Sequence, residues 1–227
     1  MTSPFRISFI LGILLIALSF SFPFILPNTA PYMPEHFRVP LFAFQFAESE
    51  AEVEKMFGPL DSEERVRMIE KMDRGNQLDF LYIVFYGLFL LFFGMDAAKT
   101  SGEKVFFAAS VLAVAVMIGD VLENVQLFSI TSKLGTIPFE DTLDKLATYT
   151  WLKWGGLAII FLILGVYLMK EKGPVFTKII GGLGVSMVLL VLIAYVQHFM
   201  IEPYCILANL MLFLLVGYAG WWQFRKH

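Results

Sequence analysis

Two carboxylates and two amides occur late in an apolar stretch that begins at Val105 and is long enough to cross a bilayer. Asp120, Glu123 and Asn124 have the spacing i, i+3 and i+4, which puts all three on one face of a helix. A charged side chain near the bilayer centre costs roughly 2.5–3.5 kcal/mol, so such residues face protein, pair with each other or line a wet cavity. The pattern therefore predicts a polar wall within the membrane, and other parts of the chain must supply its partners.

Two other apolar stretches carry residues that could complete a site around this wall. Asp79 opens one of them, and Tyr82 and Tyr86 follow on the same helical face. Lys153, near the start of another, is the only permanently charged base within the apolar stretches, so we expect it to bridge to the carboxylates of the wall. If Asp79 joins them, three carboxylates face one lysine, and their mutual repulsion favours proton binding at one of them.

The composition sets the class of protein. Of the 227 residues 58% are hydrophobic and only 16% are charged, with a mean hydropathy of +0.71, which indicates an integral membrane protein. The single cysteine, Cys205, excludes an intramolecular disulfide and leaves no cysteine cluster for zinc. The net charge is −3, without a basic cluster interleaved with aromatics, so we expect no nucleic-acid partner. We predict neither a metal nor another cofactor.

The hydropathy pattern predicts an all-α fold, a polytopic bundle of six transmembrane helices. Residues 1–27 are interpreted as a retained membrane anchor. A cleaved signal peptide is the alternative, but its apolar region would span only about 7–15 residues, and here the run is longer and interrupted by Pro23 and Pro27. Residues 78–227 form the other five spans. The six predicted spans are residues 7–26, 78–95, 105–128, 149–169, 176–200 and 204–222.

Residues 28–77 form the only sizeable soluble segment, which is acidic, with ten acids and six bases. Two short helices are expected there. The first covers about residues 49–57 and ends at Gly58, and the second is capped by Asp61 and ends before Gly75. We interpret the acids as a solvated surface, with a cation-binding cap as the alternative. The aromatic stretch 39–46 is expected to lie on the membrane surface or to pack onto the spans.

The distribution of lysine and arginine predicts the orientation. One set of alternate loops holds eight bases against three acids, whereas the other set is acidic, so both termini and the basic loops should be cytoplasmic. The polar residues of the spans then fall in the outer half, which predicts a polar chamber that opens outward beneath residues 28–77. The bases on the cytoplasmic side are Arg6, Lys99, Lys104, Lys170, Lys172, Lys178, Arg225 and Lys226.

The run that starts at Leu78-Asp79, the stretch Asp120-Val-Leu-Glu-Asn-Val and the pair Lys153-Trp154 resemble a loose group of uncharacterised bacterial polytopic membrane proteins, over about residues 42–160. The resemblance implies the inner (plasma) membrane of a bacterium but no activity. Ceramidase-type acyl-chain hydrolases offer a comparison, but their histidine-rich zinc pattern is missing here. The resemblance groups Asp79, Asp120, Glu123, Asn124 and Lys153 as one set.

Three functions fit these features, and the first is our prediction. It is a lipid-facing binding or accessory protein, which contacts membrane lipid, takes a small-molecule or lipid ligand in the outer leaflet and could associate with another membrane protein. The second is an intramembrane enzyme acting on a lipid-like substrate, with His198 or Glu123 as acid or base. The third is a proton-linked carrier, although a one-sided chamber is a poor conduit. A purely structural cluster that joins spans two, three and four is the plainer alternative.

Overall fold

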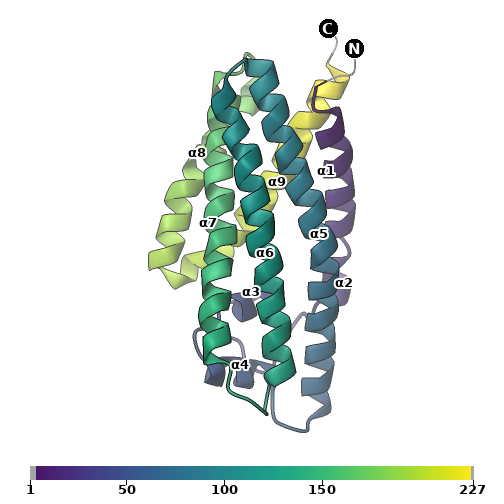
Figure 1. Cartoon of the computed structure of the whole chain (residues 1–227), viewed down its shortest axis with the longest axis vertical. Coiled ribbons are helices and arrows are strands. Elements are labelled where there is room, and N and C mark those ends of the chain that lie inside the picture. Colours follow the sequence, from purple (N-terminus) through teal and green to yellow (C-terminus); the bar gives the residue numbers. More distant parts are fainter. Residues whose placement is uncertain (1–3, 226–227) are drawn as a thin grey trace.

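The computed structural model describes residues 4–225, so the first three residues of the predicted anchor and Lys226 lie outside it. Over this range the chain is helical, with no strand (Figure 1). Six helical segments are long and apolar enough to cross a membrane, which confirms the predicted all-α six-span bundle. They are α1 (Arg6–Ser19) with α2 (Phe22–Ile25), α5 (Glu63–Ser101), α6 (Phe107–Lys133), α7 (Glu140–Lys170), α8 (Val175–Val196) and α9 (Ile201–Phe224).

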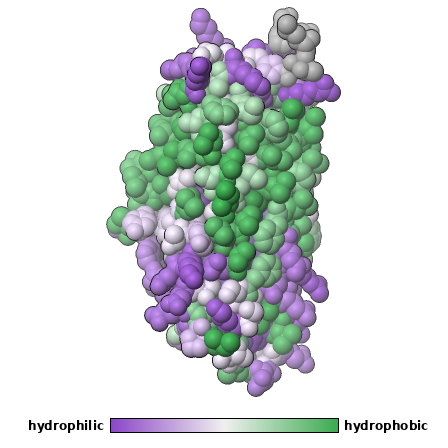
Figure 2. All heavy atoms as spheres, viewed as in Figure 1, coloured by the Kyte–Doolittle hydropathy of each residue, from purple (hydrophilic) through white to green (hydrophobic). Residues whose placement is uncertain are grey.

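The start of α1 and the end of α9 lie at one end of the bundle, which we call the terminal side, and α4 (Glu50–Phe57) lies at the opposite end, the distal side (Figure 1). Three short elements complete the described chain, namely α3 (Pro40–Gln45) and the 3-10 turns η1 (Lys104–Phe106) and η2 (His198–Met200). Hydrophobic residues cover a broad band of the surface, and hydrophilic residues gather at the terminal end and over the distal part (Figure 2). The band is the surface expected to contact lipid.

Helix α5 is longer than any bilayer crossing requires. Its 39 residues rise about 58 Å, against a hydrocarbon core of about 30 Å, so it extends well into the distal hydrophilic region. The prediction of a separate short helix that ends before Gly75 is therefore wrong. The helix passes through Gly75, and the missing side chain there leaves room for Leu26. Its cap is Ser62 rather than Asp61, because the Ser62 hydroxyl accepts a hydrogen bond from the Arg65 N–H.

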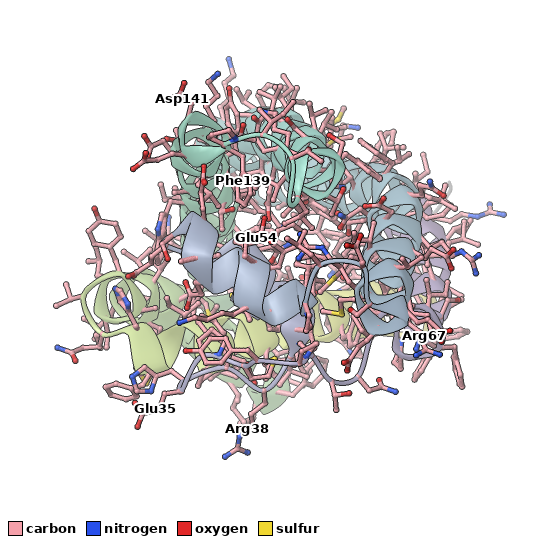
Figure 3. The ribbon with its side chains drawn as sticks, turned by 90° about the horizontal axis from the view of Figure 1, so that it is seen from below. Glu35, Arg38, Glu54, Arg67, Phe139 and Asp141 are labelled. Atoms are coloured by element: carbon pink, nitrogen blue, oxygen red, sulfur yellow. The ribbon has the colours of Figure 1, made fainter. Side chains whose placement is uncertain are left out.

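The distal region has a hydrophobic core of its own. Val53 and Phe57 of the predicted helix α4, which does end at Gly58, pack with Leu127 of α6 and Leu146 of α7, all fully buried. The soluble segment and the distal ends of the spans thus share one core. Figure 3 shows α4 lying across these helix ends, seen from the distal side.

Polar contacts fix α4 in this position. Arg65 Nη2 lies 2.6 Å from Glu54 Oε2, and Arg65 Nη1 donates to the Gly58 carbonyl at 2.8 Å. Glu54 Oε1 accepts from the Gly135 N–H in the loop between α6 and α7 at 2.8 Å, and Glu50 accepts from the Phe139 N–H. At least two of the acids that were interpreted as a solvated surface therefore hold the distal loops together.

The aromatic stretch 39–46 packs onto the spans. Phe42 makes an edge contact with Trp154, and Phe46 makes one with Trp151, at centroid distances of 6.0 and 5.3 Å. The buried Glu202 carboxylate of α9 accepts hydrogen bonds from the N–H groups of Arg38 and Val39, at the start of α3. Helix α3 is thereby attached to α7 and α9, and it covers the distal end of the space between them.

The connection between α8 and α9 differs from the prediction. Turn η2 forms it, whereas residues 201–203 belong to the first turn of α9, where a proline such as Pro203 is tolerated because that N–H has no helical acceptor. Span five accordingly ends at Val196.

The first span is an integrated part of the bundle. Phe5 and Leu15 are fully buried, and the Asp96 carboxylate of α5 accepts hydrogen bonds from the Phe5 N–H and the Ser8 hydroxyl. The helix is interrupted between Ser19 and Phe22, where α2 takes over. The first span, if retained, therefore forms one wall of the bundle.

Helices α7 and α8 approach each other through glycines. A side chain at Gly184 would lie 2.7 Å from the Phe161 carbonyl oxygen, and one at Gly165 would lie 2.7 Å from the Gly181 carbonyl oxygen. Gly181 and Gly184 of α8 thus make this contact, although Gly182 of the same helix faces open space.

We expect Gly184→Val to force α7 and α8 apart and to lower the free energy of unfolding by about 1–3 kcal/mol. Thermal unfolding in detergent should then show a midpoint several degrees lower. Gly182→Val is the matched control, because nothing lies within 4 Å of that position. Equal midpoints for the two variants would show that the glycine contact does not hold the helices together.

Candidate functional site

A buried ion-pair triad joins α6 and α7. Lys153 Nζ lies 2.7 Å from Asp120 Oδ1 and 3.0 Å from Glu123 Oε2. The side chain of Lys153 is 8% exposed and those of Asp120 and Glu123 are 1% and 0% exposed, so water screens these contacts little. The i, i+3 spacing on α6 is what allows one ammonium group to reach both carboxylates.

A hydroxyl and an amide extend the triad to α5. The Tyr86 hydroxyl donates a hydrogen bond to Asp120 Oδ2 at 2.6 Å, and Asn124 Nδ2 donates one to Asp79 Oδ2 at 2.8 Å. We call Asp79, Tyr86, Asp120, Glu123, Asn124 and Lys153 the polar cluster. Its members come from three helices, so the cluster also fixes how α5, α6 and α7 are aligned along their axes.

Tyr82 lies beside the polar cluster and connects α5 to α9. Its hydroxyl donates to Asn209 Oδ1 at 3.0 Å, and its ring lies 5.6 Å from that of Tyr86. Asn209 in turn donates to the Cys205 carbonyl oxygen at 2.9 Å. Asn209 is a site residue that the sequence reasoning missed, although it is the only amide in the predicted sixth span and carried that signal.

His198 is not brought to the polar cluster. It lies in the exposed turn η2, where its Nδ1 is 3.0 Å from Glu48 Oε1, and these two side chains are 53% and 67% exposed. It therefore cannot share a proton or an ion with Asp120 and Glu123. Within residues 4–225, no three His, Cys, Asp or Glu side chains are arranged to hold a metal ion.

Four members of the polar cluster, Asp79, Tyr86, Asp120 and Lys153, form one wall of a cavity of about 560 Å³, a size typical of ligand pockets. The cavity lies between α1–α2, α3, α5 and α9. Its polar lining consists mainly of Asp79, Tyr82, Tyr86, Asp120, Lys153 and Asn209, and its apolar lining includes Phe20, Phe22, Leu26, Phe42, Leu157, Leu212 and Phe213. Phe20 is 70% exposed, so the cavity reaches the surface of the bundle beside the break in the first span.

Two buried polar atoms of the cavity lining lack partners. The indole N–H of Trp154 and Oε1 of Gln45 have no hydrogen bond within the described part of the chain, although these residues are only 4% and 3% exposed. An unpaired buried polar group costs about 1–3 kcal/mol, so both atoms are places where a bound molecule would gain hydrogen bonds. Neither residue was singled out from the sequence as a ligand contact, because a tryptophan near the end of a span and a glutamine in a loop are common without such a role.

The terminal half of the bundle also holds a small polar network, which the sequence reasoning did not anticipate. The hydroxyl groups of Tyr167 and Tyr218 lie 2.9 Å apart, and Thr100 Oγ1 is 3.0 Å from the Tyr167 hydroxyl. Each hydroxyl has a partner, so this network serves packing.

Comparison with known proteins finds no match, since no family model, no curated protein and no solved structure matches the chain. The function is therefore inferred from the geometry of the polar cluster and the cavity.

We expect Lys153→Met to cost about 3–5 kcal/mol of stability, because it leaves the Asp120 and Glu123 carboxylates buried without their cation. Thermal unfolding in detergent measures the loss, and the exposed Lys99→Met is the matched control. Adding Glu123→Gln to Lys153→Met should recover part of the stability by removing one of the two charges. An unfolding midpoint for Lys153→Met equal to that of Lys99→Met would contradict this account of the triad.

Proposed function

We propose that this protein binds an amphiphilic, lipid-like molecule in the cavity between α1–α2, α3, α5 and α9. The observation that carries the proposal is the combination of mostly apolar walls with one wall made by the buried polar cluster. An alkyl chain would contact the phenylalanines and leucines, and the polar group of the same molecule would contact Asp79 and Tyr82. Such a division of the lining suits an amphiphile better than a small polar solute.

Access from the membrane supports the same proposal. The first span is broken beside the cavity, and Phe20, at the break, is a lining residue that is mostly exposed. A chain could enter there from the lipid without crossing the hydrophilic distal region. Helix α3, held by Glu202, lines the distal end of the cavity with Pro40, Leu41 and Phe42.

Binding is favoured over a carrier or an enzyme by two observations. The lining of the cavity reaches Tyr86 and Leu157, and fully buried phenylalanines, Phe89 and Phe93, fill α5 beyond that depth, so the cavity has no direct continuation along this helix. Of the two residues considered as acid or base, His198 lies in the exposed turn η2, and Glu123 is paired with Lys153 and is not part of the cavity lining. The polar cluster itself is held by internal ion pairs and hydrogen bonds, as a preformed binding wall would be.

For the orientation, we propose a bacterial inner membrane with the terminal side in the cytoplasm and the distal side outside. The support is the distribution of lysine and arginine, which concentrates in the short loops and ends of the terminal side. The cavity then opens to the outer leaflet.

The orientation is testable with single added cysteines, since the native Cys205 is buried. In spheroplasts, a membrane-impermeant maleimide should label Glu63→Cys, on the distal side, and should label Lys172→Cys, between α7 and α8, only after lysis. The reverse labelling pattern would overturn the proposed orientation.

The cavity is testable with a bulky residue at its edge. We expect Ser19→Trp, which places an indole in the cavity lining, to reduce labelling by a photoreactive alkyl probe at least fivefold. Ala17→Trp adds the same side chain to the exposed face of α1 and should leave labelling unchanged. Mass spectrometry of the labelled protein locates the adducts. Equal labelling of the two variants, or adducts confined to lipid-facing residues outside the cavity, would overturn the proposed function.

A further inference from the structure

We propose that the polar group of the ligand is an organic ammonium, held by the Asp79 carboxylate and the rings of Tyr82 and Tyr86. This inference rests on the proposed function of the cavity and goes one step further, because it names the chemical class of the head group. It follows from the charges of the polar cluster, from the aromatic lining of the cavity and from the unpartnered Gln45 Oε1.

The charge balance leaves Asp79 without a cation. Lys153 contacts Asp120 and Glu123, and it is the only basic residue of the polar cluster. Asp79 receives one hydrogen bond, from the neutral amide of Asn124, and forms no ion pair within the described residues. It also lines the cavity. The polar cluster has three carboxylates and one lysine, so a positively charged ligand would pair with the carboxylate that Lys153 does not contact.

Arg38 does not supply the missing charge. Arg38 is exposed, and its N–H donates to Glu202 where the chain enters α3. Its guanidinium group points away from the bundle in the distal view (Figure 3). Asp79 is therefore the carboxylate left for a ligand.

Aromatic rings surround the position next to Asp79. Tyr82 and Tyr86 follow it on the same face of α5, and the Phe22 ring meets the Tyr82 ring edge-on at 5.4 Å. Rings of this kind attract ammonium groups through their negative faces, and they do so more strongly where water is excluded. A carboxylate with adjacent aromatic rings is the chemistry that recognises an ammonium head group.

The unpartnered atom of Gln45 supplies an independent observation. Its Oε1 is an acceptor, buried in the lining of the same cavity, and it has no donor within the described residues. An ammonium N–H group is a donor that could satisfy it. An anionic head group could accept a hydrogen bond from the unpartnered Trp154 N–H but not donate one to Gln45 Oε1, and it would also have to compete with Asp120 and Glu123 for Lys153.

The test uses two bromine-bearing dodecyl probes that differ only in the head group, an amine and an alcohol. Bromine quenches tryptophan fluorescence at contact, and Trp154 lines the cavity. We measure quenching of the full chain in maltoside micelles at pH 7.5, where an alkylamine is charged. Trp154→Phe shows how much of the quenching comes from this cavity, since Trp151, Trp221 and Trp222 remain.

We expect the amine to bind about tenfold more tightly than the alcohol, and Asp79→Asn to remove this preference while the alcohol still binds. Asp73→Asn is the matched control, since Asp73 lies on α5 outside the cavity lining and bonds to Thr131. Equal affinities for both probes in the unmodified protein would overturn the ammonium assignment and leave the lipid-like ligand standing. Absence of Trp154-dependent quenching by either probe would overturn the proposed function as well.

Discussion

The Lys153 ammonium group between the carboxylates of Asp120 and Glu123 is the interaction on which the rest of the structure depends. All three groups are buried at membrane depth, where none could persist without the others. Their contacts fix α7 against α6, and the hydrogen bond from Tyr86 to Asp120 brings α5 into the same register. The ion pairs therefore determine which side chains face the space between α5 and α9, and so they determine the polar wall of the cavity.

Around this wall the bundle is built in two parts. In the band expected to contact lipid, packing is apolar, and small residues such as Gly165 and Gly184 let helices approach closely. Distal to it, α4 and the extended ends of α5, α6 and α7 share a second core, which is tied by Arg65 and Glu54. The cavity lies where the two parts meet, beneath α3. Helix α3 is held in place by Glu202, and the groups of the polar wall are already paired with each other. Both features suit a binding site that forms before its ligand arrives.

Local spacing was enough to predict the face shared by Asp120, Glu123 and Asn124, and the cost of an unpaired charge was enough to predict the partner of Lys153. Contacts that depend on the packing of distant elements were not predictable in this way. The contact between Gly75 and Leu26 appears only when α2 is placed beside α5, and the place of His198 depends on where α8 ends. The roles of Asn209 and Gln45 likewise appear only when α9 and α3 are placed beside α5 and α7. The six spans were predictable because each has enough consecutive apolar residues in its own sequence to cross a bilayer.

The most direct measurement of the central claim is an experimental structure of the protein in a lipid bilayer, resolved well enough to show density between α1–α2, α5 and α9. The account predicts an elongated density in the cavity, with its polar end beside Asp79 and Tyr82 and its chain along the phenylalanine and leucine walls. A collapsed cavity, with Asp79 closed onto Lys153 and no room for a ligand, would contradict it and would leave the polar cluster as a purely structural joint between three helices.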